Sequence, residues 1–133
     1  MMTQPIFTTK DLNKAEMFLK KKQAKEHFDF KSYYATPDDH VLKFVKRINA
    51  KDYAIYDITG SIRKDGYVVL YINRKPYMKH RFIMEAFNGP KPYGMEIDHV
   101  NSRKTDNTLS NLMYVTHAQN MEKYWREYHS KKA

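Results

Sequence analysis

The stretch from Met95 to Tyr128 decides the fold and reads MEIDHVNSRKTDNTLSNLMYVTHAQNMEKYWREY. An apolar strand pattern ends at Asp98-His99, and a loop rich in Asn, Ser and Thr follows it. A second apolar strand pattern comes next. Thr116 then begins a helix, because Thr116 and Gln119 fit a capping box. The stretch therefore predicts a β-hairpin followed by a helix, a ββα unit.

Four polar side chains interrupt the apolar pattern of this unit: Asp98, His99, Asn111 and Asn120. A hairpin packed on a helix brings Asp98 and His99 close to Asn120 in the first turns of that helix. Carboxylate and amide oxygens suit Mg²⁺ or Mn²⁺, and an imidazole can take a proton from an attacking water near neutral pH. We expect Asn111 to tie the loop ends together and to fix the His99 ring. The set predicts metal-dependent phosphodiester hydrolysis.

Asp98 and His99 are adjacent in sequence, and adjacent side chains of a regular strand point to opposite faces. Both can serve one site only where the strand ends or bulges at that pair. The polar pair Asn101-Ser102, which follows directly, favours such an interruption.

The preceding chain predicts two parts, a basic helical extension over 1–51 and a domain over 52–133. In the extension, Thr9 is expected to cap a helix over about 10–28. A second helix is expected from Thr36-Pro37 to near Asn49.

The second part predicts a small antiparallel sheet over 53–80, because β-branched and aromatic runs alternate there with turn signals. A short helix over 81–87 follows, with Gly89 available as its C-cap. The ββα unit occupies 95–128, and the fold class is α+β. On the last helix, one stripe is expected to face the core: Ala118, Met121, Trp125 and Tyr128.

The composition is that of a basic, cysteine-free chain of 133 residues with 41% hydrophobic residues and a formal charge of +9. The absence of cysteine excludes disulfides and thiolate zinc sites. No apolar run reaches the length of a membrane span, and the N-terminus lacks the apolar core of a signal peptide. We expect no membrane and a cytoplasmic location, in a bacterial or phage-infected host cell.

The positive charge predicts a polyanionic partner, with nucleic acid first and an anionic membrane surface next. Of the nucleic acids, double-stranded DNA is the expected partner. Residues 1–51 hold eleven basic against six acidic residues, whereas residues 92–133 hold six against five. Most of the charge therefore lies outside the suspected site. The candidate DNA contacts are Arg63, Lys64, Arg74, Lys75, His80, Arg81, Arg103, Lys104 and His117. Of these, the first four are expected to cluster at the turns of the sheet, and His80 has an equally good structural interpretation.

The segments KHRFIMEAFNGP and EIDHVNSRKTDNTLSNLMYVTHAQN resemble HNH endonucleases of the phage and group I intron homing type. The ordered set that carries the resemblance is Asp-His, an Asn twelve residues after that His, and an Asn twenty-one residues after it. The preceding ITGSIRKDGYVVLYINRKPYMKH resembles the N-terminal β region of the family. The resemblance covers roughly residues 53–128 and implies the ββα-metal fold.

The resemblance implies that His99 is the general base and that Asp98 and Asn120 hold one divalent metal per active site. It also implies that Asn111 is the central, structural Asn of the motif. Many relatives have His where this chain has Asn120, and Asn favours Mg²⁺ or Mn²⁺ over Zn²⁺ or Ni²⁺. The expected activity is DNA hydrolysis without a small-molecule cofactor, by a monomer or weak dimer that nicks one strand.

Two alternatives stand beside the nuclease hypothesis. The chain could use the HNH fold for non-catalytic DNA binding, against which the intact Asp98, His99 and Asn120 set argues. It could also be a ribonuclease or a toxin nuclease, which a direct comparison of RNA with duplex DNA as substrates would decide.

Overall fold

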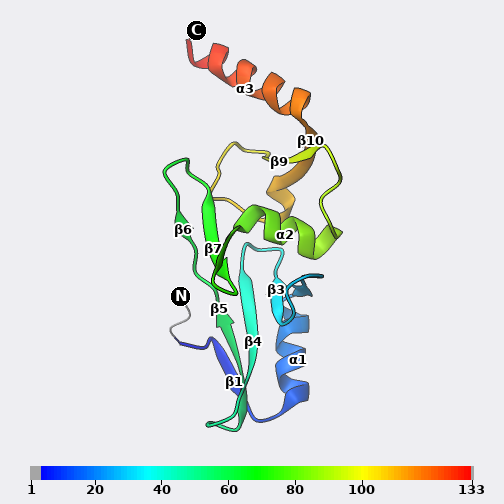
Figure 1. The fold of residues 1–133 in the computed structure, drawn as a ribbon, viewed down its shortest axis with the longest axis vertical. Helices are drawn as coiled ribbons and strands as arrows, with labels where there is room; N and C mark the ends of the chain where they lie inside the picture. Colours follow the sequence, from blue (N-terminus) through cyan, green and yellow to red (C-terminus); the bar gives the residue numbers. More distant parts are fainter. Residues whose placement is uncertain (1–3, 133) are drawn as a thin grey trace.

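The computed structural model describes residues 4–132, which form three antiparallel sheets and three α-helices (Figure 1). The predicted α+β class is confirmed. None of the helices in the described part of the chain is both long enough and apolar enough to span a membrane.

Five strands form the N-terminal sheet, in the order β1-β5-β4-β3-β2. The long β4-β5 hairpin lies at its centre, where Phe44 pairs with Ile55. Helix α1 covers this sheet with its buried residues Ala15 and Leu19, as Figure 1 shows. The elements are β1 (Phe7–Thr9), α1 (Leu12–Lys21), β2 (Lys25–Glu26), β3 (Tyr33–Ala35), β4 (Val41–Arg47) and β5 (Asp52–Asp57).

The prediction that 1–51 is a helical extension is wrong. The first helix is shorter than 10–28, and Asp11 rather than Thr9 caps it by accepting the Asn13 N–H. The second predicted helix is strand β4, because its β-branched and aromatic residues pair across the hairpin, where they fit a pleated surface. The predicted boundary after residue 51 falls in the turn of this hairpin. Residues 1–3 and 133 of the two predicted parts lie outside the described residues.

The second sheet is a meander of three strands, β6-β7-β8, that leads directly into helix α2. The single sheet predicted over 53–80 is therefore two, because β5 belongs to the N-terminal sheet. The short helix is confirmed, and Gly89 ends it at φ 79°, a backbone conformation that L side chains rarely adopt. The elements are β6 (Ser61–Ile62), β7 (Val68–Ile72), β8 (Lys75–Met78) and α2 (Lys79–Asn88).

The ββα unit is confirmed in its order and almost in its bounds. The two strands pair antiparallel, with His99 opposite Leu112 at the loop end. The predicted capping box is present, since the Thr116 N–H donates to Gln119 Oε1 and the Gln119 N–H donates to Thr116 Oγ1. The elements are β9 (Met95–His99), the 3₁₀ helix η1 (Leu109–Asn111), β10 (Leu112–Thr116) and α3 (His117–Lys132).

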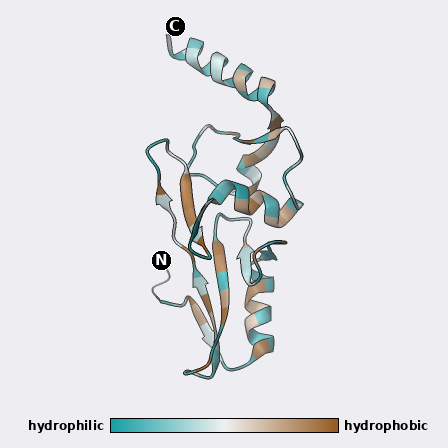
Figure 2. Cartoon of the chain, viewed as in Figure 1, coloured by the Kyte–Doolittle hydropathy of each residue, from teal (hydrophilic) through white to brown (hydrophobic). Residues whose placement is uncertain are grey.

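One core joins the N-terminal sheet, the meander, α2 and the hairpin. It contains the fully buried Leu70 of β7, Phe82 and Ile83 of α2, and the buried Leu112 of β10. Figure 2 shows the hydrophobic residues along β4, β7 and the inner side of α2. Because these side chains are buried together, α2 packs against the β9-β10 hairpin and its position relative to the hairpin is fixed.

The expectation that α3 turns an apolar stripe to the core is wrong. Met121, Trp125 and Tyr128 are 37%, 50% and 39% exposed. The half-buried side chains of α3 are Asn120, Lys123 and Glu127. The helix packs against β9 and β10, and the residues that β9 turns toward it are Glu96 and Asp98, so polar side chains make the contact.

A buried carboxylate connects the N-terminal sheet to the part of the protein formed by the meander and α2. Glu85 of α2 is 3% exposed and accepts hydrogen bonds from His27 Nε2 (2.9 Å), Arg81 Nε (3.0 Å) and the Tyr77 hydroxyl. His27 Nδ1 accepts the Asp29 N–H, so the His27 proton is on Nε2. Burial alone would raise the pKa of Glu85, but these hydrogen bonds outweigh it and hold the pKa below its ordinary value. His27 is 3% exposed, so it is buried in this network.

Replacing Glu85 by Ala should lower the free energy of unfolding by about 3 kcal/mol, because the buried His27 loses its acceptor. Urea denaturation followed by circular dichroism measures the change. Glu122→Ala, at an exposed carboxylate of α3, is the control and should change stability by less than about 0.5 kcal/mol. Equal effects of the two substitutions would contradict a structural role for the network.

Candidate active site

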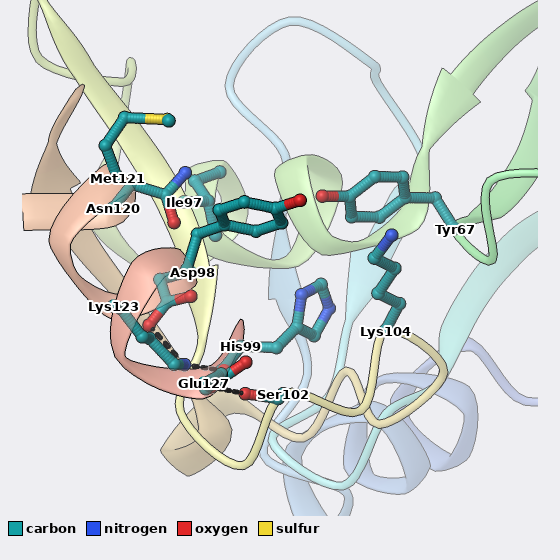
Figure 3. Close-up of a pocket in the computed structure, with 11 residues that line it drawn as sticks. Tyr67, Ile97, Asp98, His99, Ser102, Lys104, Asn120, Met121, Lys123 and Glu127 are labelled. Carbon is teal, nitrogen blue, oxygen red and sulfur yellow. Dashed lines mark hydrogen bonds and ion pairs between the residues drawn. The ribbon is translucent and has the colours of Figure 1, made fainter. Parts of the chain in front are cut away.

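A cavity of about 540 Å³ lies between the hairpin, α3 and the residues that precede β7 (Figure 3). Three of the four predicted side chains line it, namely Asp98, His99 and Asn120. The sequence analysis did not assign several other lining residues to the site, because their types carry no metal-site signal and only the fold brings them to the cavity. They are Tyr67, Ile97, Ser102, Met121, Lys123, Tyr124 and Glu127.

Asp98 and His99 reach this cavity from opposite sides of β9. Figure 3 shows the Asp98 carboxylate toward α3 and the His99 ring toward Tyr67 and Lys104. The pairing of β9 with β10 is regular through His99, and the strand ends there. The end of the strand, rather than a bulge, therefore lets two adjacent residues serve one cavity.

The His99 ring is held by Asn107, a residue that the sequence did not single out. His99 is 4% exposed and Asn107 is fully buried. Asn107 Oδ1 lies 2.7 Å from His99 Nε2. An amide oxygen only accepts hydrogen bonds, so the His99 proton is on Nε2 and Nδ1 is the nitrogen that can accept a proton. The prediction that Asn111 fixes this ring is wrong.

Asn111 closes the loop between the two strands, as predicted. Its Oδ1 accepts the Asn101 N–H at 3.0 Å, and its Nδ2 donates to Asn101 Oδ1 and to the Asp106 backbone oxygen. The Val100 N–H also donates to the Asn111 backbone oxygen. The side chain is 9% exposed, so these contacts replace water and fix the loop that carries Asn107.

Asn120 is oriented by Glu96, which lies two residues before Asp98 on the same side of β9. The Asn120 Nδ2 donates to Glu96 Oε1 at 2.7 Å, and Glu96 Oε2 accepts from His117 at 2.7 Å. Hydrogen bonds from Asn120 and His117 lower the pKa of Glu96, which keeps it ionised. With the amide nitrogen engaged, the Asn120 Oδ1 is left for a ligand.

The oxygens of Asp98 and Asn120 fit a divalent cation. Both are hard donors of the kind that Mg²⁺ and Mn²⁺ take, and both line the same cavity. Among residues 4–132, no three or more His, Cys, Asp or Glu side chains gather in a way that could hold a metal. The two protein oxygens would therefore need water and phosphate oxygens to complete the coordination shell.

The candidate DNA contacts are divided by the fold. The turn with Arg63 and Lys64 and the turn with Arg74 and Lys75 lie at opposite ends of β7. The four residues lie at turns of the sheet, as expected, but a five-residue strand separates the two turns by roughly 15 Å, so they do not form one cluster. Lys104 lines the cavity, lies over the Tyr67 ring at 4.7 Å, and donates to the Asp65 backbone oxygen. The Arg63–Lys64 turn is thus the one that adjoins the cavity.

Other candidate contacts have protein partners already. Arg81 bonds to Glu85 and lies over the Tyr77 ring. His117 is exposed and paired with Glu96, and Arg103 is exposed in the loop after β9. Whether these residues touch DNA stays a prediction.

His80 lies beside His99, with ring centroids 5.2 Å apart, and its Nδ1 is buried without a hydrogen-bond partner among the described residues. Burial, followed by the nearby His99 and Arg81, lowers the pKa of His80 to about 4. His80 is therefore a neutral ring at pH 7 that packs against the His99 ring.

Comparison with known proteins agrees with this geometry. Residues 77–122 match the model of a family described as HNH endonuclease. This segment contains α2, the hairpin and the start of α3, with all four motif residues. The resemblance to HNH endonucleases is therefore confirmed for this segment of the chain.

The chain is also similar to a solved structure of the HNH homing endonuclease I-HmuI, a protein described there by its DNA binding and cleavage. The TM-score is 0.61 at 23% identity, over 78% of this chain and 58% of that chain. The likeness shows a shared fold, and this chain spans less than two thirds of that protein's length. A comparison with curated proteins gave no match.

Acid should destabilise the protein through His80. The pKa of His80 is about 4 in the folded state, below the ordinary 6.5. Between pH 6.5 and 4, His80 is therefore protonated in the unfolded chain but not in the folded protein, so a fall in pH favours unfolding. Stability should fall by up to about 3 kcal/mol between pH 6.5 and 4, and His80→Gln should remove this part of the slope. Urea denaturation at several pH values measures it, with His129→Gln, on an exposed residue of α3, as control. An unchanged slope in His80→Gln would contradict the prediction.

Proposed function

We propose that this protein is a divalent-metal-dependent DNA endonuclease that hydrolyses phosphodiester bonds. The observation that carries the proposal is the meeting of Asp98, His99 and Asn120 at one cavity, inside the segment that matches the HNH endonuclease family. The fold is shared with I-HmuI, a homing endonuclease described as binding and cleaving DNA, and this likeness supports the same class of substrate.

His99 is the proposed general base. Asn107 holds the Nε2 proton, which leaves Nδ1 to accept a proton from the attacking water. Because the ring is buried between Asn107, His80 and the end of β9, it keeps one orientation without help from the substrate. Asp98 and Asn120 would hold Mg²⁺ or Mn²⁺, and the metal would supply charge stabilisation at the phosphate and at the leaving oxygen.

One such site in a chain fits the cutting of one strand at a time. We propose nicking by a monomer, with Lys104 and the adjoining Arg63–Lys64 turn on the DNA backbone. A double-strand cut would require a second copy of the site.

Supercoiled plasmid incubated with Mg²⁺ should convert to open circle, and EDTA should stop the conversion. His99→Ala should slow cleavage at least about a hundredfold while it retains DNA binding, because only the proton acceptor is lost. Gel electrophoresis measures the cleavage, and gel-shift assays measure the binding. His129→Ala, on an exposed residue of α3, should cleave like the wild type.

The outcomes separate the candidate functions. Full cleavage by His99→Ala would remove this residue from the base role. A folded protein that binds DNA and never cleaves it would favour a binding module, and preferential cleavage of RNA would favour a ribonuclease.

DNA binding should weaken with salt, because Lys and Arg side chains release counterions when they neutralise phosphates. Four such contacts would reduce affinity about a hundredfold between roughly 50 and 200 mM salt. Lys104→Met should reduce the slope of log affinity against log salt concentration by about one. Lys20→Met, at an exposed residue of α1, should leave this slope unchanged. Fluorescence anisotropy with a labelled duplex measures the slope, and a flat response would contradict the electrostatic contacts.

A further inference from the structure

Lys123 occupies the carboxylate that the metal would need. Its Nζ lies 2.8 Å from Asp98 Oδ2, and it donates to the backbone oxygens of His99 at 2.6 Å and Val100 at 3.2 Å (Figure 3). The side chains of Lys123 and Asp98 are 23% and 15% exposed. The ammonium is thus directed at three oxygens and sheltered from most of the solvent.

This contact neutralises Asp98, the charged member of the proposed pair of metal ligands. Asp98 is the one charged ligand of the pair, and the Lys123 ammonium balances its charge. Asn120 adds an uncharged oxygen. The ionised Glu96 has both carboxylate oxygens bonded, to Asn120 and His117, and Glu127, which also lines the cavity, accepts a hydrogen bond from Ser102. A divalent cation that binds Asp98 would lie close to the positive charge of Lys123. The Asp98–Lys123 pair has no net charge, so it offers the cation no net electrostatic attraction.

We propose that Lys123 makes metal binding at Asp98 and Asn120 depend on DNA. In the free protein, its positive charge keeps the affinity for Mg²⁺ or Mn²⁺ low. A DNA phosphate in the cavity adds negative charge that both the ammonium and the metal can neutralise, so metal and DNA bind with positive cooperativity. This inference rests on the proposed metal-dependent nuclease function.

The arrangement of α3 supports this role for Lys123. The residue follows Asn120 by one helical turn on the same half-buried face, so one rigid element carries both a proposed metal ligand and the opposing charge. The Lys123 ammonium has three N–H donors, and two of them bond to the backbone oxygens at the end of β9. The third contact, to the carboxylate, places its charge within the cavity that Asp98 and Asn120 line.

Titration of the full chain with Mn²⁺, with unbound Mn²⁺ followed by electron paramagnetic resonance, tests the inference without any cleavage. Lys123→Met should bind Mn²⁺ roughly tenfold tighter than the wild type in the absence of DNA. Lys123→Arg keeps the charge and should resemble the wild type. Lys131→Met, on an exposed residue of the same helix, removes an equal charge away from the site and should also resemble the wild type.

The second arm adds a short duplex in a His99→Ala background, which prevents hydrolysis, with Mn²⁺ bound by the duplex alone subtracted. The duplex should tighten Mn²⁺ binding in the chain with Lys123 roughly tenfold, and this gain should shrink when Lys123 is also replaced by Met. Unchanged or weaker Mn²⁺ binding by folded Lys123→Met would overturn the inference.

Asp98→Ala separates this inference from the proposed function. If Asp98→Ala abolishes Mn²⁺ binding but Lys123→Met does not tighten it, the role of Lys123 is refuted and the proposed metal site is not. Mn²⁺ binding that is insensitive to Asp98→Ala, with and without DNA, would refute the metal site itself and the inference with it.

Discussion

The arrangement of the N-terminal sheet relative to the meander and α2 depends on the buried carboxylate of Glu85. An ionised carboxylate in the interior is tolerated only when donors surround it, and these come from three segments. His27 precedes β3, Tyr77 belongs to β8 and Arg81 to α2. Satisfying one anion therefore fixes the N-terminal sheet against the meander and the helix under the active site.

Contacts of an acidic side chain also hold the loop that carries Asn107. The Asn107 N–H donates to Asp39 Oδ2 and the Leu109 N–H donates to the Pro37 backbone oxygen, so a loop of the N-terminal sheet holds the segment that orients His99. Lys79, at the start of α2, is in turn paired with Asp39. Residues outside the family segment thus support the proposed general base, His99, so the N-terminal sheet contributes to the geometry of the candidate site as well as to stability.

The sequence predicted what local pattern and spacing determine, and missed what tertiary contacts determine. The hairpin, the capping box and the Gly89 helix end depend on nearby residues, and all are present. The run from Val41 resembled a helix in its spacing, yet pairing with β5 decided for a strand. Asn107 and Lys123 had no signal, because a buried amide and a lysine become informative only when the groups that they contact are known.

Helix α3 reverses the usual relation between amphipathicity and packing. Its aromatic residues are exposed, and its polar face holds it to the hairpin through Asn120, Lys123 and a hydrogen bond from Ser102 to Glu127. The proposed chemistry and the anchoring of the helix therefore share the same side chains. A substitution on this face would therefore change the proposed chemistry and the anchoring of the helix together.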